Sequence, residues 1–289
     1  MAYVTAKLGG GLGNQLFQIA TAYTLALDLG VDFKISYKNH RNPGQGRPPD
    51  RYANSIFSKV VVSNIALFSD DVDQASINED RYTYRPILDR VRECINRLGH
   101  ACITGYFQSD RYFAHRSAEI RSLFTPSGGY RRWLIESRPD VAEIYRDLLE
   151  DNSYCFIGVR RGDYTTPAYR GWFNPCGATY YRRAMQQMPT ERYYISSDDI
   201  EWCKQTFIGP QFHFIEKTDD IAKFALMTLF RRFIISNSTF YWWGSYLSQY
   251  YDTSVIAPDK WLMGPDATFS DYYSIYREDM TIIERPIEY

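Results

Sequence analysis

Two adjacent arginines, a glycine and an aspartate follow an apolar run in the second half of the chain. The segment at 158–164 reads Gly-Val-Arg-Arg-Gly-Asp-Tyr, and the apolar run predicts a strand over Tyr154–Arg160. Ligands of open α/β sheets bind beyond the carboxyl ends of the strands, and paired guanidinium groups there suit a diphosphate. We therefore expect Arg160 and Arg161 to neutralise such an anion without a metal ion. A surface ion pair with Asp163 is the alternative.

A cluster of hydroxyl side chains follows another expected strand, Phe233–Ser236. The sequence Ser-Asn-Ser-Thr at 236–239 leads into a helix expected over Phe240–Tyr250. Hydroxyl groups and unpaired N–H groups at the start of a helix can hold a phosphate. Ser238 and Thr239 are therefore candidates for a second phosphate contact, with ordinary helix capping as the alternative.

Two short acidic segments occupy similar places. Ser-Ser-Asp-Asp at 196–199 follows an expected strand, and Thr-Asp-Asp at 218–220 opens an expected helix. A carboxylate in either place could accept the two N–H donors of a guanine edge. Helix capping is the alternative for each.

A glycine-rich turn lies near the N-terminus. Residues 9–15 read Gly-Gly-Gly-Leu-Gly-Asn-Gln, between a strand expected over Tyr3–Leu8 and a helix over Gln15–Leu29. Glycines permit positive φ angles and let a ligand approach the backbone closely. The spacing is neither that of a dinucleotide-binding turn nor that of a P-loop. The turn predicts a nearby ligand, or else a tight turn in which Asn14 caps the helix.

Metal binding has one weak candidate, Asp71 and Asp73, which have the spacing of an Asp-x-Asp pair. They lie in a polar stretch and do not follow a buried strand, so we expect no metal site. The four histidines are scattered and show no ligand spacing.

The elements that must position these residues alternate between short apolar runs and segments of helical period, which predicts parallel sheets with crossover helices. The glycines and proline of Thr125–Tyr130 are the best boundary signal. We expect an N-terminal Rossmann-like domain over 1–130 and a C-terminal one over 131–289. The expected strands of the second are Tyr154–Arg160, Arg192–Ser196, Phe212–Ile215, Phe233–Ser236 and Ser254–Ala257. The expected helices between them are Gly177–Gln187, Ile200–Phe207, Asp219–Phe230 and Phe240–Tyr250.

Composition restricts the function further. Lys and Arg number 33 against 34 Asp and Glu, so the chain carries no basic surplus for nucleic acid or anionic membrane. Aromatic residues make up 17% of the 289 residues, which suits either sugar-stacking surfaces or an aromatic core. The most apolar stretch, Leu16–Val31, is interrupted by polar residues, so no membrane span is expected.

Five motifs in order resemble the family-11 glycosyltransferases, the α-1,2-fucosyltransferases. They are Gly-Gly-Gly-Leu-Gly-Asn-Gln-Leu-Phe-Gln at 9–18, Gly-Tyr-Phe-Gln-Ser at 105–109, Val-Arg-Arg-Gly-Asp-Tyr at 159–164, Tyr-Ile-Ser-Ser-Asp-Asp at 194–199 and Ser-Asn-Ser-Thr-Phe-Tyr-Trp-Trp at 236–243. The resemblance implies a GT-B-type enzyme of two facing Rossmann-like, doubly wound domains. It also implies that transfer inverts the configuration of the anomeric carbon and needs no metal or other cofactor. One departure is Gly158, because the family usually has a histidine there.

The resemblance also implies roles for the motif residues. Arg160 would contact the diphosphate of GDP, Arg161 and Asp163 would hold its loop, and Asp163 is also the candidate base. The donor-side residues so implied are Arg160, Arg161, Asp198, Asp220, Ser238 and Thr239. Among them, Asp198 and Asp220 are the candidates for guanine or ribose contacts. The residues implied on the sugar and acceptor side are Gly11, Gly13, Asn14 and Gln15.

The activity implied is transfer of L-fucose from GDP-fucose to the 2-hydroxyl of a terminal galactose in a glycan. Gly158 leaves two alternatives: the same fold with another nucleotide-sugar donor or linkage, or a module that binds nucleotide or carbohydrate without turnover. The partners expected are GDP-fucose and a galactose-terminated glycan, with no nucleic acid and no integral membrane segment. We expect a cytoplasmic protein of bacterial or viral type, close to a membrane where its acceptor is lipid-linked.

Overall fold

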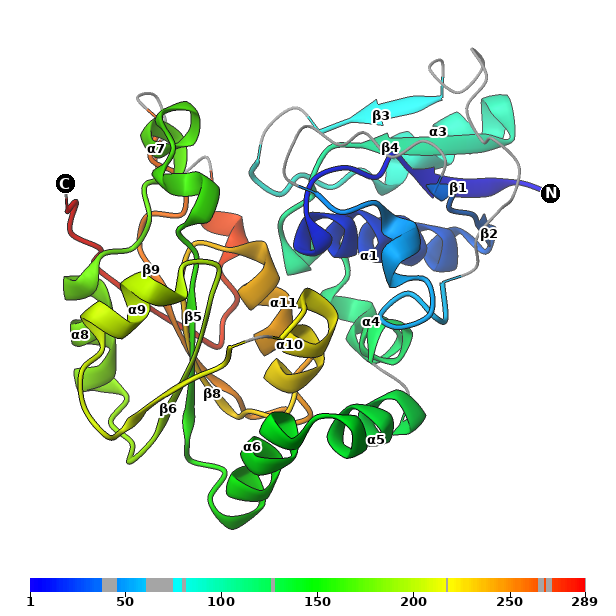
Figure 1. Cartoon of the computed structure of the whole chain (residues 1–289). Coiled ribbons are helices and arrows are strands. Elements are labelled where there is room, and N and C mark those ends of the chain that lie inside the picture. The colour runs from blue at the N-terminus through cyan, green and yellow to red at the C-terminus, as the bar shows by residue number, and fades with distance from the viewer. Residues whose placement is uncertain are drawn as a thin grey trace. The chain divides into compact units, whose positions relative to one another are not determined.

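Parallel β-sheets flanked by helices form the framework of the chain (Figure 1). The computed structural model describes residues 1–37, 46–60, 75–79, 82–125, 128–216, 218–264, 268 and 272–288. The chain divides into two units, Met1–Thr125 with Ser270–Arg277 and Pro126–Phe269 with Glu278–Tyr289. Each unit contains one sheet whose strand pairs are all parallel. The expected fold class, two α/β units with parallel sheets, is confirmed.

The division between the units differs from the predicted boundary in two respects. The sequence places the boundary after residue 130, whereas the structure places it after Thr125 and returns Ser270–Arg277 to the first unit. The returning segment is held by contacts far apart in sequence: the Tyr84 N–H donates to Ser274 Oγ over 2.8 Å. Local composition carries no signal for such a contact.

The second unit has the strand order β10-β9-β8-β5-β6-β7. Numbered within the unit this is 6-5-4-1-2-3, the doubly wound order of a Rossmann sheet. The strands are β5 (Cys155–Val159), β6 (Tyr193–Ser197), β7 (Phe212–Phe214), β8 (Arg232–Ile235), β9 (Ser254–Pro258) and β10 (Met280–Ile283). The order reverses between β5 and β8, so the carboxyl ends of these two strands mark the expected ligand crevice.

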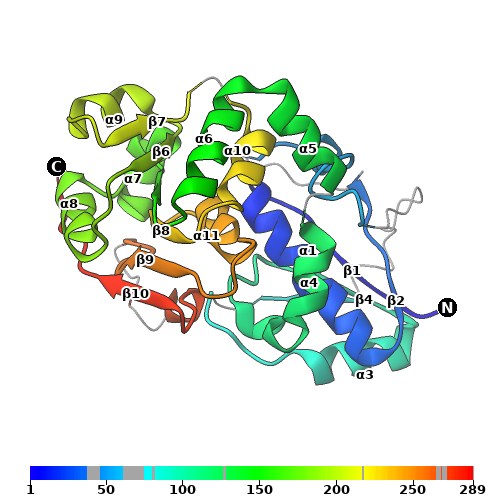
Figure 2. The same cartoon turned by 90° about the horizontal axis from the view of Figure 1, so that it is seen from below.

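Helices cover both faces of this sheet. Figures 1 and 2 show α8 (Ala178–Gln187) and α9 (Ile200–Thr206) on one side, with α10 (Asp220–Met227) and α11 (Thr239–Tyr246) on the other. All five residues of β5 are buried, as a strand covered on both faces requires. Ile157 packs in the core cluster that contains Tyr181 of α8, and the neighbouring Phe156 contacts the Tyr241 ring of α11. The remaining helices are α5 (Gly128–Ser137), α6 (Pro139–Glu150) and α7 (Pro167–Phe173).

The first unit has a four-stranded sheet of order β2-β1-β4-β3. Its main elements are β1 (Tyr3–Ala6), α1 (Leu12–Leu29), β2 (Asp32–Phe33), β3 (Ser76–Asn78), α3 (Leu88–Leu98), β4 (His100–Thr104) and α4 (Ser117–Phe124). Helix α1 ends at Gly30, whose φ of 64° is the left-handed C-cap conformation that glycine adopts most easily.

Helix α1 begins three residues earlier than the predicted Gln15. Gly11 is extended and precedes the helix, and its carbonyl accepts the N–H of Gln15 over 3.1 Å. Asn14 therefore lies inside the first turn, and the alternative role as helix cap is wrong for it. Glycine is among the residues accepted at the N-cap, and Gly11 occupies this position without a side-chain cap hydrogen bond.

Candidate active site

The carboxyl ends of β5, β6 and β8 bring together most of the polar residues expected on the donor side. Arg160 directly follows β5, Asp198 follows β6, and Ser236 follows β8. The Arg160 N–H donates to Ser236 Oγ over 3.2 Å, which joins the two strand ends at the reversal of the sheet. The predicted cluster therefore lies at the one place where this topology favours a ligand.

The guanidinium of Arg160 lies between two carboxylates. Its Nη2 is 2.7 Å from Asp163 Oδ1, and its Nη1 is 2.9 Å from Asp198 Oδ2. Burial lowers the pKa of Arg160, but Asp198, Tyr164 and Asp163 together raise it above its ordinary value. The group thus keeps its positive charge, and a guanidinium has five N–H donors for which carboxylates and a bound anion can compete.

The side chain of Arg161 contacts the start of α9. Its Nε pairs with Asp199 Oδ2 at 3.0 Å, and its guanidinium lies 4.0 Å from the ring centroid of Trp202. Both partners belong to the start of α9, so the side chain fixes the loop after β5 to that helix. This is the loop-holding role implied by the resemblance.

Asp198 holds the same loop. Both of its carboxylate oxygens have protein partners, so it is not free to recognise a guanine ring. Its Oδ1 accepts the N–H of Arg161 over 2.8 Å, while Oδ2 pairs with Arg160. A Cβ at Gly162 would lie 2.5 Å from Asp198 Oδ2, so the loop can approach this carboxylate only with glycine there. Asp199 caps α9 by accepting the Trp202 N–H, which matches the capping alternative.

The start of α11 contains Ser238 and Thr239, as expected. Ser238 is the N-cap residue, is buried, and makes no side-chain cap hydrogen bond. The preceding Asn237 holds the turn, because its Nδ2 donates to the carbonyls of Phe173 and Trp261 over 2.9 and 3.0 Å. An eight-residue helix therefore begins at the reversal of the sheet, where its first N–H groups can receive an anion.

Two residues of this site were missed by the sequence reading. Lys223 of α10 donates from Nζ to the carbonyl of Ser197 over 3.1 Å. Tyr241 of α11 donates from its hydroxyl to the carbonyl of Ser196 over 3.0 Å. The signal for Lys223 was the capping aspartate four residues before it, because Asp219 accepts the Ala222 N–H and fixes where α10 begins. Asp220, expected as a guanine or ribose contact, is the first residue of that helix.

The glycine-rich turn of the first unit lies at the carboxyl end of β1. Gln15 is fully buried, and its Nε2 donates to the carbonyls of Gly10 and Arg47 over 3.0 and 2.8 Å. Gln15 therefore holds the turn from inside and does not face an acceptor, which corrects the expected role. Gly13 is buried as well, whereas Gly11 and Asn14 are partly exposed.

Asn14 contacts a second motif of the first unit. Its Oδ1 accepts a hydrogen bond from Gln108 Nε2 over 2.9 Å. Gln18 donates from Nε2 to the Gly105 carbonyl over 2.8 Å and accepts the Gly9 N–H over 2.9 Å. Side chains of α1 thus join the turn after β1 to the turn after β4.

The described residues contain neither a metal-binding cluster nor a membrane-spanning helix. No group of three or more His, Cys, Asp or Glu residues is placed to hold a metal ion within the described part of the chain. Asp71 and Asp73 lie outside the described residues. Among the helices described, none has the length and apolar character needed to cross a membrane.

Known proteins similar to this chain include several glycosyltransferases. The family model for glycosyl transferase family 11 matches residues 100–284. The chain is 28% identical to an alpha-1,2-colitosyltransferase of Escherichia coli over 284 residues, which covers 90% of this chain and 93% of that protein. It is 26% identical to human galactoside alpha-(1,2)-fucosyltransferase 1 over 162 residues, 50% of this chain and 42% of the human protein. A solved structure of the fucosyltransferase NodZ from Bradyrhizobium aligns with a TM-score of 0.47 at 15% identity, over 84% of this chain and 91% of that one.

Proposed function

Because the chain belongs to glycosyltransferase family 11, we propose that it transfers L-fucose from GDP-fucose to the 2-hydroxyl of a terminal galactose. The observation that carries the proposal is the hydrogen bond from the Arg160 N–H to Ser236, which lies two residues before the N-cap of α11 at the reversal of the second unit's sheet. A fixed guanidinium and a helix N-terminus are the two protein features that best accommodate a diphosphate.

The chemistry follows from the charge that develops as the donor breaks. The acceptor hydroxyl attacks the anomeric carbon in line, and negative charge accumulates on the departing GDP. Arg160 exchanges part of its bonding with Asp163 and Asp198 for the diphosphate, and the first N–H groups of α11 with Ser238 and Thr239 receive the remaining oxygens. We propose that these groups replace a metal ion. Asp220 stays our candidate for the ribose or the guanine edge.

The donor sugar has one specific alternative. The E. coli relative is an alpha-1,2-colitosyltransferase, and colitose is L-fucose that lacks the 3-hydroxyl. A site that hydrogen-bonds this hydroxyl discriminates strongly against the deoxy sugar, whereas a site without that contact discriminates weakly. GDP-colitose is therefore the second donor that we propose for this chain.

The test is nucleotide release by the purified protein from GDP-fucose, GDP-colitose and UDP-galactose, in EDTA, with and without galactose-terminated oligosaccharides. We expect GDP to be released from GDP-fucose and the release to rise with acceptor. Exclusive use of GDP-colitose would show that this sugar nucleotide, and not GDP-fucose, is the donor. GDP release that does not depend on the acceptor would contradict the proposed transferase activity. Tight GDP binding without any release would favour a binding module.

A further inference from the structure

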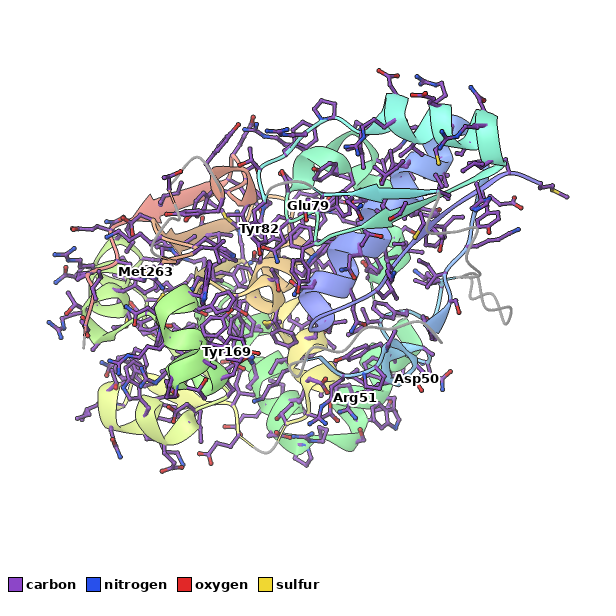
Figure 3. All side chains as sticks on the ribbon, turned by 90° about the horizontal axis from the view of Figure 1, so that it is seen from above. Asp50, Arg51, Glu79, Tyr82, Tyr169 and Met263 are labelled. Carbon is purple, nitrogen blue, oxygen red and sulfur yellow. The ribbon has the colours of Figure 1, made fainter. Side chains whose placement is uncertain are left out.

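The carboxylate of Glu79 lies at the carboxyl end of the first unit's sheet and is not part of the sites described above. Glu79 is the first residue after β3, and Figure 3 shows it near Tyr82, where the chain leaves that strand. The side chain is partly exposed. A carboxylate in this place can reach a ligand bound at the strand ends.

Backbone N–H groups hold the carboxylate in one orientation. Oε2 accepts the Tyr106 N–H over 2.6 Å, and Oε1 accepts the Phe107 N–H over 3.0 Å. A carboxylate has about four lone-pair positions, so two backbone contacts leave room for a substrate hydroxyl. The side chain is thus oriented and can still accept a proton.

The turn that supplies these donors is strained. Phe107 has a φ of 52° although it is not glycine, and it is fully buried. Gly105 has a φ of 150°, and a Cβ there would lie 2.3 Å from Glu79 Cβ. Backbone strain such as that of Phe107 concentrates at functional sites. The turn is therefore shaped around this carboxylate.

The same turn is joined to the glycine-rich turn. Gln18 bonds both Gly105 and Gly9, and Gln108 bonds Asn14. Glu79 therefore belongs to one hydrogen-bonded cluster with the residues expected on the acceptor side. Tyr82 and Tyr84 add aromatic rings with hydroxyl groups, which suit a sugar.

We propose that Glu79 is the catalytic base, an inference that rests on the function proposed above. The acceptor oxygen forms the new bond to the anomeric carbon with a lone pair, and its proton passes to a carboxylate oxygen of Glu79. The bond from the anomeric carbon to the diphosphate breaks, and its electron pair leaves with GDP. Asp163 is the competing candidate, but its carboxylate forms an ion pair with Arg160.

Burial supports this role. It raises the pKa of Glu79 above the ordinary 4.5, although the hydrogen bonds from the Phe107 and Tyr106 backbone lower it. A base works best when its pKa approaches the working pH. The titratable groups in electrostatic contact with this cluster are Tyr82, Tyr106 and Tyr112, with Tyr84 and Arg85 beside Tyr112. Burial raises the pKa of Tyr82, and that of Tyr112 to about 12, so these two phenols stay neutral where Glu79 titrates.

The experiment compares Glu79→Gln with Asp163→Asn and with Glu93→Gln, an exposed glutamate of α3 that serves as the matched control. We measure kcat, the acceptor KM, the Kd of GDP and the melting temperature. Glu79→Gln should lower kcat by about 10²–10⁴-fold with the Kd of GDP unchanged. It should also remove the acidic limb of the pH profile of kcat, which lies above pH 4.5 in the wild type. Asp163→Asn should weaken GDP binding. Glu93→Gln should leave both kcat and the Kd of GDP unchanged.

A folded Glu79→Gln enzyme with wild-type kcat, or with the acidic limb retained, would overturn the proposal. If this variant does not fold, Glu79→Asp decides: a shifted acidic limb supports the base, and an unshifted one refutes it. Acceptor-stimulated GDP release by the wild type is measured first. Its absence with every donor would overturn the proposed function and this inference with it, whereas normal release by Glu79→Gln would overturn the inference alone.

Discussion

The ring of Tyr241 fills the space into which any side chain at Gly158 would project. A Cβ at position 158 would lie 2.4 Å from Tyr241 Cγ, too close for two carbons. The Tyr241 hydroxyl also bonds the carbonyls of Ser196 and Val159 over 3.0 and 3.3 Å, so the same residue joins the ends of β5 and β6. Gly158, the departure from the family motif noted in the sequence, is therefore matched by a tyrosine from α11.

This relationship predicts that the two positions are energetically coupled. Gly158→Ala should lower the free energy of unfolding by about 1–3 kcal/mol, because a methyl group is forced against a buried ring. Tyr241→Ala removes the ring and should cost about 3–5 kcal/mol. In the double variant the clash is gone, so its loss should be smaller than the sum of the single losses.

Urea denaturation of the four proteins measures this coupling. Gly171→Ala is the matched control, since a Cβ at that helical position would have nothing within 4 Å. This control should leave stability unchanged or raise it by up to about 1 kcal/mol. Strictly additive losses for Gly158→Ala and Tyr241→Ala would show that the ring does not restrict position 158.

A second prediction concerns Arg160. Arg160→Ala should keep the fold and lower kcat/KM by about 10²–10³-fold, because the departing diphosphate loses its fixed positive charge. Arg160→Lys should recover only part of this loss, because an ammonium group lacks the planar pair of donors. Initial rates of GDP release and the Kd of GDP are the measurements.

Arg183→Ala provides the control for that series. Arg183 is an exposed residue of α8, and its Nη1 forms a surface ion pair with Glu284 at 2.7 Å. Its removal should leave kcat/KM at the wild-type level. Equal activity in Arg160→Ala would place the diphosphate elsewhere.

Much of the second unit could be predicted from the sequence because its strands are covered on both faces. The buried run of β5 and the β-branched run of β8 are apolar without alternation, and the loops after them carry the polar residues. The positions of Arg160 after β5 and of Ser238 in the loop after β8 followed directly from this change from apolar strand to polar loop. Roles were harder to predict, because Arg160 and Arg161 are adjacent residues of one type and differ only in the partners that the fold supplies.

The first unit was less accessible to prediction. Its strands β2 and β3 have two and three residues, too short for a periodic signal. Glu79 follows one of these short strands, and its hydrogen-bond donors lie 27 and 28 residues further along the chain. No local pattern announces such a contact, so the carboxylate became visible only in the folded chain.

A third prediction concerns metal ions. Transfer should proceed at the same rate in excess EDTA and in added Mg²⁺ or Mn²⁺, because Arg160 and the start of α11 supply the positive charge. Initial rates of GDP release in EDTA and across a metal titration are the measurement. A strict requirement for a divalent ion would shift attention to Asp71 and Asp73.

The last prediction uses the partly buried ammonium group of Lys223. Burial lowers its pKa below the ordinary 10.5, although Asp198, Asp220 and Asp219 raise it. The amine is charged below its pKa and attracts the diphosphate in that form, so this attraction is lost as the pH rises through the lowered value. Lys223→Arg keeps its charge throughout this range. The ratio of the GDP Kd values of wild type and Lys223→Arg should therefore change on the alkaline side while the pH is still below 10.5. Ionisation of the guanine ring affects both proteins and cancels in the ratio.

The control is Lys204→Arg, at an exposed residue of α9. The ratio of the GDP Kd values of wild type and Lys204→Arg should stay constant, because ion pairs with Glu216 and Glu201 raise the pKa of Lys204. Parallel pH curves for wild type and Lys223→Arg would remove Lys223 from the nucleotide site.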